Sequence, residues 1–271
     1  MHILITDSGV GGLSVVAYAE RFVRTRGFRE PVRLTFAYAA PANDYGFNSM
    51  PTREAKLETF DRFLRNVTAR YAPDMIYVAC NTLSVLRPDL PGIVETGVEL
   101  VARSLAPDAL ALIFATQTTT DSGAYPRLLG ERGIDPSRIV SQACPGLADA
   151  ISEDRAGDRA AAEIQRWVAE AMAKVPRRDA PVVACLACTH YGYRKEMFAA
   201  AMPGAIVINP NESAVGDLFD RGGDSHEVDV RFVTRYALPP ATVETLSWLL
   251  REISPKTVAA MQNFEHVPDL F

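Results

Sequence analysis

Short apolar runs alternate with amphipathic segments along most of this chain, and that alternation limits the folds open to it. The apolar runs are rich in β-branched residues, and segments with helical periodicity, such as residues 52–71 and 158–175, lie between them. This order predicts repeated strand–helix units that form mainly parallel sheets, and hence an α/β fold. The runs that we expect to form strands are residues 2–6, 32–38, 75–80, 110–116, 138–144, 181–188 and 205–209.

Several of these runs end in polar residues. Asp7 and Ser8 follow the first run, and Cys80 ends the third, with Asn81 directly after it. Open parallel sheets bind ligands beyond the carboxyl ends of their strands. We therefore expect the functional residues at the ends of the predicted strands.

The two halves of the chain repeat a faint pattern. In each half a later apolar run ends in a cysteine that small polar residues follow, Cys80 in "ACNT" and Cys188 in "ACTHY". Two similar α/β domains that face each other would place these cysteines on opposite sides of one cleft. We expect a first domain formed by residues 1–95 plus 210–271 and a second formed by residues 96–209.

The composition is that of an ordinary globular protein, and it argues against some classes of function. Of the 271 residues, 48% are hydrophobic and 23% are charged, and the formal net charge is −5. That charge gives no basic surface for nucleic acid, so none is expected as a partner. No apolar stretch approaches the roughly 18 residues of a membrane span, and no charged leader precedes one. We expect a cytoplasmic protein without a membrane partner.

Four cysteines in a chain of this length do not suggest a disulfide framework. Cys185 and Cys188 have the C-x-x-C spacing that redox pairs and zinc sites share. A redox pair should begin a helix, whereas this pair ends an apolar run. A zinc site needs a second pair of ligands, and His2, His226 and His266 show no ligand spacing. Both alternatives stay open, although we expect no metal.

Cys80 and Cys188 each stand where a strand is expected to pass into a helix. Backbone N–H groups and the helix dipole favour a thiolate at such a point, and Thr82, Ser84 and Thr189 are suitable cap residues for the turns that follow. A single thiolate would suggest a covalent nucleophile. Two facing cysteines suggest that one removes a proton from carbon while the other delivers a proton to the opposite face, which is racemisation by two bases.

A series of short motifs follows in a specific order along the chain. They are "DSGVGGLSV" (7–15), "YG" (45–46), "ACNT" (79–82), "TTTDS" (118–122), "ACP" (143–145) and "ACTHY" (187–191). In type and order they resemble the motifs of the glutamate racemases, relatives of aspartate racemase that work without pyridoxal phosphate. The resemblance extends from residue 3 to about residue 215. It implies two similar flavodoxin-like or Rossmann-like domains with mainly parallel sheets and an active site at their interface.

The resemblance also implies roles for the residues at matching positions. It makes Cys80 and Cys188 the two acid/base groups, with Asp7 near Cys80 and His190 near Cys188 as proton-transfer helpers. No cofactor is expected, so hydroxyls, amides and backbone N–H groups must stabilise the charge that develops beside the α-carboxylate. The residues that would bind the amino acid are Asp7, Ser8, Tyr45, Gly46, Asn81, Thr82, Thr116, Thr118, Thr119, Thr189 and His190.

Each of these residues also has a purely structural explanation. A cysteine that ends an apolar strand is commonly a small core residue. Cys144 and Cys185 lack the polar followers, and we expect them to be structural. The Asp7-Ser8 pair fits a turn after a strand, in which the glycines of the run supply positive φ. The same run lacks the lysine of a phosphate loop and is a weak dinucleotide signal.

Several positions depart from the pattern of the glutamate racemases. A proline is replaced in three places, a hydroxyl stands where a carboxylate is expected after "ACP", and the segment after "ACNT" is shorter. The positions are Asp44, Thr96 and Gly192 for the prolines, Ser152 for the carboxylate with Glu153 one residue late, and residues 83–97 for the short segment. These changes leave the two cysteines intact and put strict specificity for glutamate in doubt.

The sequence therefore predicts a racemase that interconverts L- and D-glutamate, and the D form is a precursor of cell-wall peptidoglycan, on which cell shape depends. Three alternatives remain. They are a racemase of another amino acid in the same superfamily, a binding or regulatory protein that keeps the cleft without turnover, and a C-x-x-C thiol oxidoreductase. The sequence does not fix the oligomeric state, for which a homodimer is one option.

Overall fold

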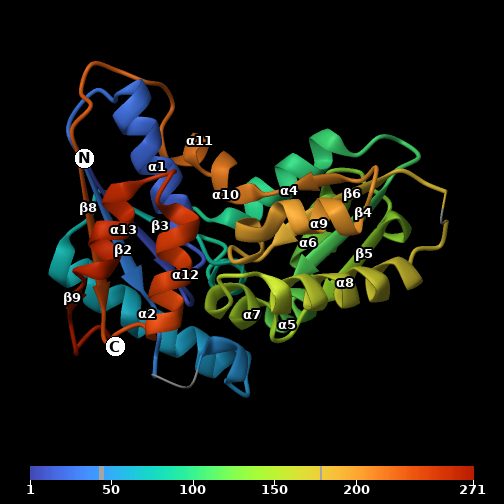
Figure 1. Ribbon diagram of the computed structural model, residues 1–271, viewed down its shortest axis with the longest axis horizontal. Coiled ribbons are helices and arrows are strands. Elements are labelled where there is room, and N and C mark those ends of the chain that lie inside the picture. The colour runs from blue at the N-terminus through green and yellow to red at the C-terminus, as the bar shows by residue number, and fades with distance from the viewer. Residues whose placement is uncertain (43–45, 178) are drawn as a thin grey trace.

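The computed structural model describes residues 1–42, 46–177 and 179–271. Within these ranges the chain forms two β-sheets, each accompanied by helices, and Figure 1 shows them as two lobes. Every pairing between neighbouring strands is parallel. The α/β fold with parallel sheets that the alternating pattern predicts is confirmed.

The first sheet consists of β1 (His2–Asp7), β2 (Val32–Tyr38), β3 (Met75–Val78), β8 (Val228–Thr234) and β9 (Glu265–His266). Its five strands follow the order β3-β1-β2-β8-β9. Strand β1 therefore lies between β2 and β3, and the register pairs Asp7 with Tyr38. The segments that follow β1 and β3 leave the sheet at the same edge.

The second sheet consists of β4 (Leu110–Ala115), β5 (Ile139–Ala143), β6 (Val182–Ala187) and β7 (Ile206–Ile208). Its four strands follow the order β5-β4-β6-β7. The carboxyl ends of β4 and β6 lie side by side, with Ala115 paired to Ala187. The residues just beyond these two strands, Thr116 and Cys188, therefore leave the sheet at one edge.

Helices connect the strands and cover the sheets. The longer helices are α1 (Leu13–Arg26), α2 (Arg53–Tyr71), α4 (Ile93–Ser104), α6 (Ala124–Glu131), α8 (Asp158–Ala173), α12 (Pro240–Leu250) and α13 (Pro255–Gln262). The shorter ones are α3 (Asn81–Ser84), α5 (Gln117–Asp121), α7 (Leu147–Glu153), α9 (Lys195–Ala201), α10 (Pro210–Ser213) and α11 (Val215–Leu218). The described residues also form 3₁₀ turns at Phe47–Ser49, Pro136–Arg138 and Tyr191–Arg194.

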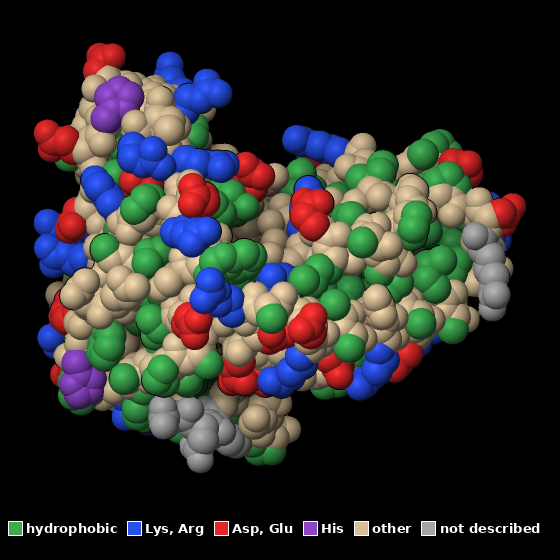
Figure 2. All heavy atoms as spheres, in the orientation of Figure 1, with side chains coloured by type: hydrophobic (Ala, Val, Ile, Leu, Met, Phe, Trp, Pro, Cys, Tyr) green, Lys and Arg blue, Asp and Glu red, His purple; other side chains and the backbone are tan. Residues whose placement is uncertain are grey.

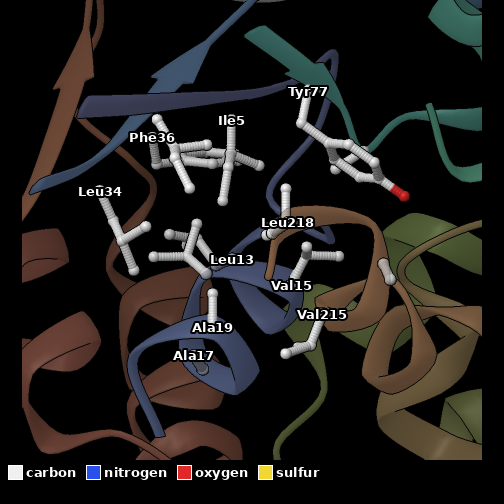
Figure 3. Packing of buried hydrophobic residues seen from close by; sticks show 14 of the residues in the cluster. Ile5, Leu13, Val15, Ala17, Ala19, Leu34, Phe36, Tyr77, Val215 and Leu218 are labelled. Atoms are coloured by element: carbon white, nitrogen blue, oxygen red, sulfur yellow. The ribbon is translucent and has the colours of Figure 1, made fainter. Parts of the chain in front are cut away.

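Apolar side chains from α1 and α11 pack on one face of the first sheet. Figure 3 shows Ile5 and Phe36 of the strands facing Leu13 and Val15 of α1, with Leu218 of α11 beside them. All five are buried. This packing holds the start of α1, and with it the glycine run that precedes the helix, at the carboxyl edge of the sheet.

The segment after Cys80 is short, as the sequence suggested. Helix α3 is a single turn, and α4 begins at Ile93 after a bridge between Val78 and Gly92. The expected strand over residues 75–80 ends at Val78 because the chain turns into α3. Strand β8 was not predicted from the sequence, since Asp229 and Arg231 interrupt its apolar residues.

The first sheet draws its strands from both ends of the chain. The expected division into residues 1–95 plus 210–271 and residues 96–209 remains a proposal. Its first boundary falls in the first turn of α4, whose Val98 and Val101 pack with β4 and β6, and its second falls where α10 begins. Over the described ranges, none of the helices combines the length and the apolar character needed to cross a bilayer.

Candidate functional site

A cavity of about 730 Å³ lies where the carboxyl edges of the two sheets meet. Residues at or just beyond the ends of six strands line it, and both sheets contribute. They are Asp7, Tyr38 and Cys80 from β1, β2 and β3, and Thr116, Cys144 and Cys188 from β4, β5 and β6. The cavity thus lies at the carboxyl ends of the strands, where open parallel sheets bind ligands. On the face of the molecule seen in Figure 2, acidic and basic side chains are interspersed.

Cys80 forms part of one wall of this cavity. It follows β3 and immediately precedes α3, and its side chain is buried. Its Sγ lies 3.1 Å from the hydroxyl oxygen of Ser8. Burial and the nearby Asp7 carboxylate raise the pKa of the Cys80 thiol well above its ordinary value, although hydrogen bonds from Ser8 and from the Leu83 backbone oppose that shift.

Cys188 forms part of the wall that the second sheet contributes, and its neighbour is an imidazole. It follows β6, it is buried, and its Sγ lies 3.8 Å from Nδ1 of His190. Burial and the Asp7 carboxylate raise the pKa of the Cys188 thiol to about 12. Burial also lowers the pKa of His190, so its imidazole is neutral near pH 7 and can accept a proton from the thiol.

These pKa directions correct one expectation. The strand ends were expected to stabilise thiolates, and backbone N–H groups do lower the pKa of each thiol, but desolvation outweighs them. Cys80 precedes a helix of only four residues, and Cys188 leads into the 3₁₀ turn Tyr191–Arg194, so neither receives the dipole of a long helix. These shifts favour the thiol form of both cysteines.

Asp7 connects the two walls. Its Oδ2 accepts a hydrogen bond from the Thr189 hydroxyl at 2.7 Å, and its Oδ1 accepts one from the backbone N–H of Gly9 at 3.0 Å. The sequence placed Asp7 beside Cys80, whereas its side-chain contact crosses to the wall that carries Cys188. Its negative charge nevertheless raises the pKa of both thiols.

The glycine run after Asp7 serves close packing. None of Gly9, Gly11 and Gly12 has a positive φ, so the turn explanation from the sequence is wrong in that respect. A methyl group added at Gly11 would collide with the Thr189 hydroxyl, and one added at Gly9 would collide with the His190 ring. Gly9 and Gly11 have no room for a side chain because the turn after β6 lies directly against them, and Gly12 has none because it lies against the Asp7 side chain.

Hydroxyl groups make contacts between the two halves at the cavity, and three of these contacts involve expected site residues. The first is the Thr189–Asp7 bond, and in the second the hydroxyls of Thr82 and Thr116 lie 2.9 Å apart. In the third, the Tyr125 hydroxyl of α6 donates to Oδ1 of Asn81 at 2.9 Å. Asn81 is buried, and its Nδ2 has no hydrogen-bond partner among the described residues.

Not every expected binding residue reaches the cavity. Gly46 lines it, whereas Tyr45 and Asp44 lie outside the described residues. Thr118 and Thr119 are not among the lining residues. Thr118 accepts a hydrogen bond from Lys56 at 2.7 Å, and Thr119 accepts one from Thr116 at 3.1 Å.

One of the departures from the racemase pattern, the displaced carboxylate, lies at this cavity. Ser152 lines it but donates its hydroxyl to the Ala148 carbonyl at 2.9 Å, which leaves no carboxylate at that position. Glu153 lies at the rim and pairs with Arg159 at 3.4 Å. The carboxylate expected after "ACP" is therefore replaced by groups that are already engaged within the protein.

The other two described departures are packing adjustments. A side chain larger than hydrogen at Gly192 would collide with Asn209 and Asn211, and Asn211 holds the Thr189 carbonyl at 2.8 Å. Thr96 donates its hydroxyl to Asp217 of α11, a contact that a proline could not make. Both substitutions therefore support the junction between the two halves.

Sequence reasoning missed Tyr38 and Asp149, which line the cavity without belonging to any of the quoted motifs. Burial raises the pKa of Tyr38 to about 12, so its phenol remains a neutral hydrogen-bond donor. Strand pairing could have identified Tyr38, because it stands opposite Asp7. The charged residues that line the described part of the cavity are Asp7, Asp149 and Glu153, and neither lysine nor arginine is among them.

The C-x-x-C pair does not form a disulfide, and all four cysteines are free thiols. Cys185 is fully buried in the second sheet, where it packs with Ala111 and Ile113. In the part of the chain that the structure describes, no three His, Cys, Asp or Glu side chains are grouped closely enough to hold a metal ion.

The sequence is similar to those of curated glutamate racemases. It is 28% identical to the enzyme of Pseudomonas entomophila over 228 residues, which is 80% of this chain and 79% of that protein. It is 29% identical to the enzyme of Granulibacter bethesdensis over 222 residues, 78% of this chain and 75% of that protein. No family model matches the sequence. The resemblance that the motifs carry is thus confirmed over most of the chain.

The fold is that of solved glutamate racemases. A glutamate racemase isoform of Bacillus anthracis superposes with a TM-score of 0.72 at 18% identity, over 92% of this chain and 93% of that chain. The enzyme of Francisella tularensis, solved in complex with D-glutamate, gives a TM-score of 0.70 at 20% identity over the same shares. At these identities the superpositions establish the fold.

Proposed function

We propose that this protein is a cofactor-independent glutamate racemase that interconverts L- and D-glutamate with two thiols. The observation that carries the proposal is that Cys80 and Cys188, which follow strands of different sheets, line one cavity. The curated relatives that bear this name support the substrate, as does the relative solved with D-glutamate. The protein is accordingly an isomerase.

The proton balance of the reaction needs both sulfurs. One cysteine acts as a thiolate and takes the α-proton, so that the Cα–H bond breaks and its electrons remain on the substrate. The other, a thiol, delivers its proton to the opposite face of Cα, and the configuration inverts. The two sulfurs have then exchanged protonation states, which leaves the enzyme ready for the reverse reaction.

A thiolate must form before this step, although burial and the Asp7 charge raise both thiol pKa values. The substrate supplies the missing charge, because its ammonium group enters a cavity whose deepest charged residue is Asp7. Two functions follow for the helpers. Asp7 offsets the ammonium charge and orients Thr189, while the neutral His190 accepts the Cys188 proton.

Neutral groups bind the substrate carboxylates in this proposal. The Ser8 hydroxyl and the unpaired Nδ2 of Asn81 are donors that the described walls offer, and the hydroxyls of Thr82, Thr116 and Thr189 would join them by turning from their present partners. Such donors, fixed in a desolvated site, stabilise the charge that spreads from Cα into the α-carboxylate. Gly46 contributes backbone at the same cavity, and Tyr45, Thr118 and Thr119 keep the binding roles that the resemblance implies.

The place of the reaction in the cell is part of the same proposal. D-glutamate is a building block of peptidoglycan, so the enzyme would supply cell-wall synthesis from the cytoplasm. We also propose a homodimer as its assembly, to be tested by the mass of the protein in solution. The substrate is a small amino acid, and neither nucleic acid nor membrane is expected as a partner.

Racemisation in D₂O tests the proposal directly. Purified protein that is incubated with L-glutamate should produce D-glutamate, seen by loss of optical rotation, with deuterium at Cα of the product by mass spectrometry. The reaction should proceed equally well from D-glutamate. If neither enantiomer exchanges its Cα proton, the protein is a binding relative without turnover and the proposal fails.

One observation favours a second substrate class. Asp149 lies close enough to the cavity that its charge raises the pKa of Cys188, and no described lining residue carries a positive side chain. A substrate with a neutral or cationic side chain would meet less repulsion there than glutamate does. Deuterium entry measured across a panel of amino acids decides between these substrates. A higher kcat/KM for a neutral or basic amino acid would make that amino acid the proposed substrate in place of glutamate.

A further inference from the structure

We propose that Tyr125 is a positioning residue, whose hydroxyl fixes the carboxamide of Asn81 so that its NH₂ group is presented to the substrate. The proposal rests on the racemase function above and adds a residue that neither the motifs nor the cavity lining singled out. Tyr125 is the second residue of α6, in the lobe of the second sheet. Asn81 is the first residue of α3, which follows strand β3 of the first sheet.

Of the two polar atoms in the Asn81 carboxamide, only the oxygen has a hydrogen-bond partner among the described residues. Its Oδ1 accepts from the Tyr125 hydroxyl at 2.9 Å, and its Nδ2 is buried without a partner among the described residues. Buried amide groups are normally satisfied, so an unpaired NH₂ in a cavity wall points to a ligand acceptor. The carboxylate oxygens of an amino acid are acceptors of the right kind.

The Tyr125 hydroxyl selects one of two carboxamide orientations. An asparagine side chain can rotate by half a turn and exchange its oxygen for its nitrogen at little steric cost. A phenol that donates to Oδ1 favours the orientation in which Nδ2 lies on the other side, which is the side without a protein partner. Without that donor both orientations become available, and one of the two presents the carboxamide oxygen, instead of the NH₂ group, to an anionic substrate.

Gly97 provides the space for this contact. A methyl group built on Gly97 of α4 would collide with the Tyr125 hydroxyl and ring. Tyr125 is otherwise fully enclosed, so its phenol has no second place to lie. The pair Gly97 and Tyr125 therefore holds one hydroxyl in one position.

The test compares two buried tyrosines. Tyr125→Phe removes the donor and keeps the ring, and it should raise KM for both enantiomers of glutamate about three- to tenfold and lower kcat by a smaller factor, because Asn81 then both binds the substrate and stabilises the developing charge less well. The enantiomers have equal free energies, so kcat/KM must fall equally in both directions, and KM is the diagnostic quantity. Tyr77→Phe is the matched control, because that buried hydroxyl bonds Thr96 and Asp217 away from the cavity and its loss should leave KM unchanged.

A double-mutant cycle tests whether Tyr125 acts through Asn81. In an Asn81→Ala background, Tyr125→Phe should change the KM or the calorimetric Kd for glutamate less than about twofold, because the group that it positions is gone. Effects that multiply would overturn the proposal. Gly97→Ala gives a second route if Tyr125→Phe does not fold, since it displaces the hydroxyl, and it should raise KM only when Asn81 is present.

A spectroscopic readout separates this proposal from the proposed function. The side-chain ¹⁵N–H signals of Asn81, identified by their loss in Asn81→Ala, should shift in Tyr125→Phe and stay in place in Tyr77→Phe. This holds whether or not the protein racemises glutamate, which the wild-type assay decides alone. Unchanged Asn81 signals in Tyr125→Phe would show that the phenol does not hold the carboxamide.

Discussion

The two walls of the cavity offer the same nucleophile in different surroundings. Cys80 has a hydroxyl neighbour, Ser8, whereas Cys188 has an imidazole neighbour, His190. A hydroxyl can hydrogen-bond a sulfur but is far too weak a base to take its proton, while a neutral imidazole can take it. Both walls share Asp7, whose charge raises the pKa of each thiol. Both walls thus offer a thiol for proton transfer, and they differ in the neighbour that can help convert this thiol into a thiolate.

The largest effect should come from removing either sulfur. Cys80→Ser and Cys188→Ser should each reduce racemisation about 10³-fold, because a serine hydroxyl does not ionise in the accessible pH range. Each variant should retain Cα deuterium exchange from one enantiomer only, and the two variants should retain opposite enantiomers. Chiral separation of the substrate after incubation in D₂O measures this. Two-way racemisation in either variant would show that the sulfurs do not act as a pair.

Asp7→Asn should reduce kcat about 10²-fold, since the group that offsets the substrate ammonium loses its charge. The pH dependence should change in a defined direction. The carboxylate raises both thiol pKa values, so its loss lowers them, and the rise of kcat/KM with pH should occur at lower pH than in the wild type. A pH–rate profile measures the shift. A shift to higher pH would mean that the Asp7 charge favours the thiolates.

The two neighbours of the sulfurs should differ in effect. His190→Asn should reduce kcat about 10- to 100-fold because a proton acceptor is lost. Ser8→Ala should reduce kcat about three- to tenfold, which corresponds to the loss of one hydrogen bond. The pKa of His190 is lowered, so its protonation should produce no step in kcat/KM near pH 7. Equal losses in the two variants would remove the distinction between the walls.

The contact between the walls should be sensitive to one methyl group. Gly11→Ala forces the Thr189 hydroxyl and the His190 backbone away, and it should lower the free energy of unfolding by about 1–3 kcal/mol and raise KM a few-fold. Gly130→Ala is the matched control, because nothing lies near its added methyl group. It should stabilise α6 by about 0.5–1 kcal/mol. Urea unfolding of the two variants measures both changes.

The smallest effect on activity should come from Cys185→Ala. This thiol is fully buried beside Tyr125 and is not among the described residues that line the cavity, so racemisation should stay within about twofold of the wild type. Stability should fall by about 1 kcal/mol from the lost packing. Loss of activity in this variant would favour the C-x-x-C oxidoreductase alternative over the two-thiol site.

Much of the site could be predicted because it depends on strand ends. Apolar runs that end in Cys80 and Cys188 place these residues beyond parallel strands, and parallel strands of one sheet end at one edge. Tyr38 was missed although it ends an expected strand, because it belongs to no distinctive motif. Strand β8 was missed because its alternating Asp229 and Arg231 suit a strand with a solvated face, a weaker signal than a continuous apolar run.

The amino-acid sequence by itself determined the parallel α/β architecture and the residues that end its strands, because both depend on local order along the chain. Only the tertiary structure decided what those residues experience. The raised pKa values of the thiols, the packing of Gly11 against Thr189 and the contact of Tyr125 with Asn81 all arise between segments far apart in the sequence. Burial, charge and close packing are properties of neighbours in space, and the two halves must meet before any of them exists.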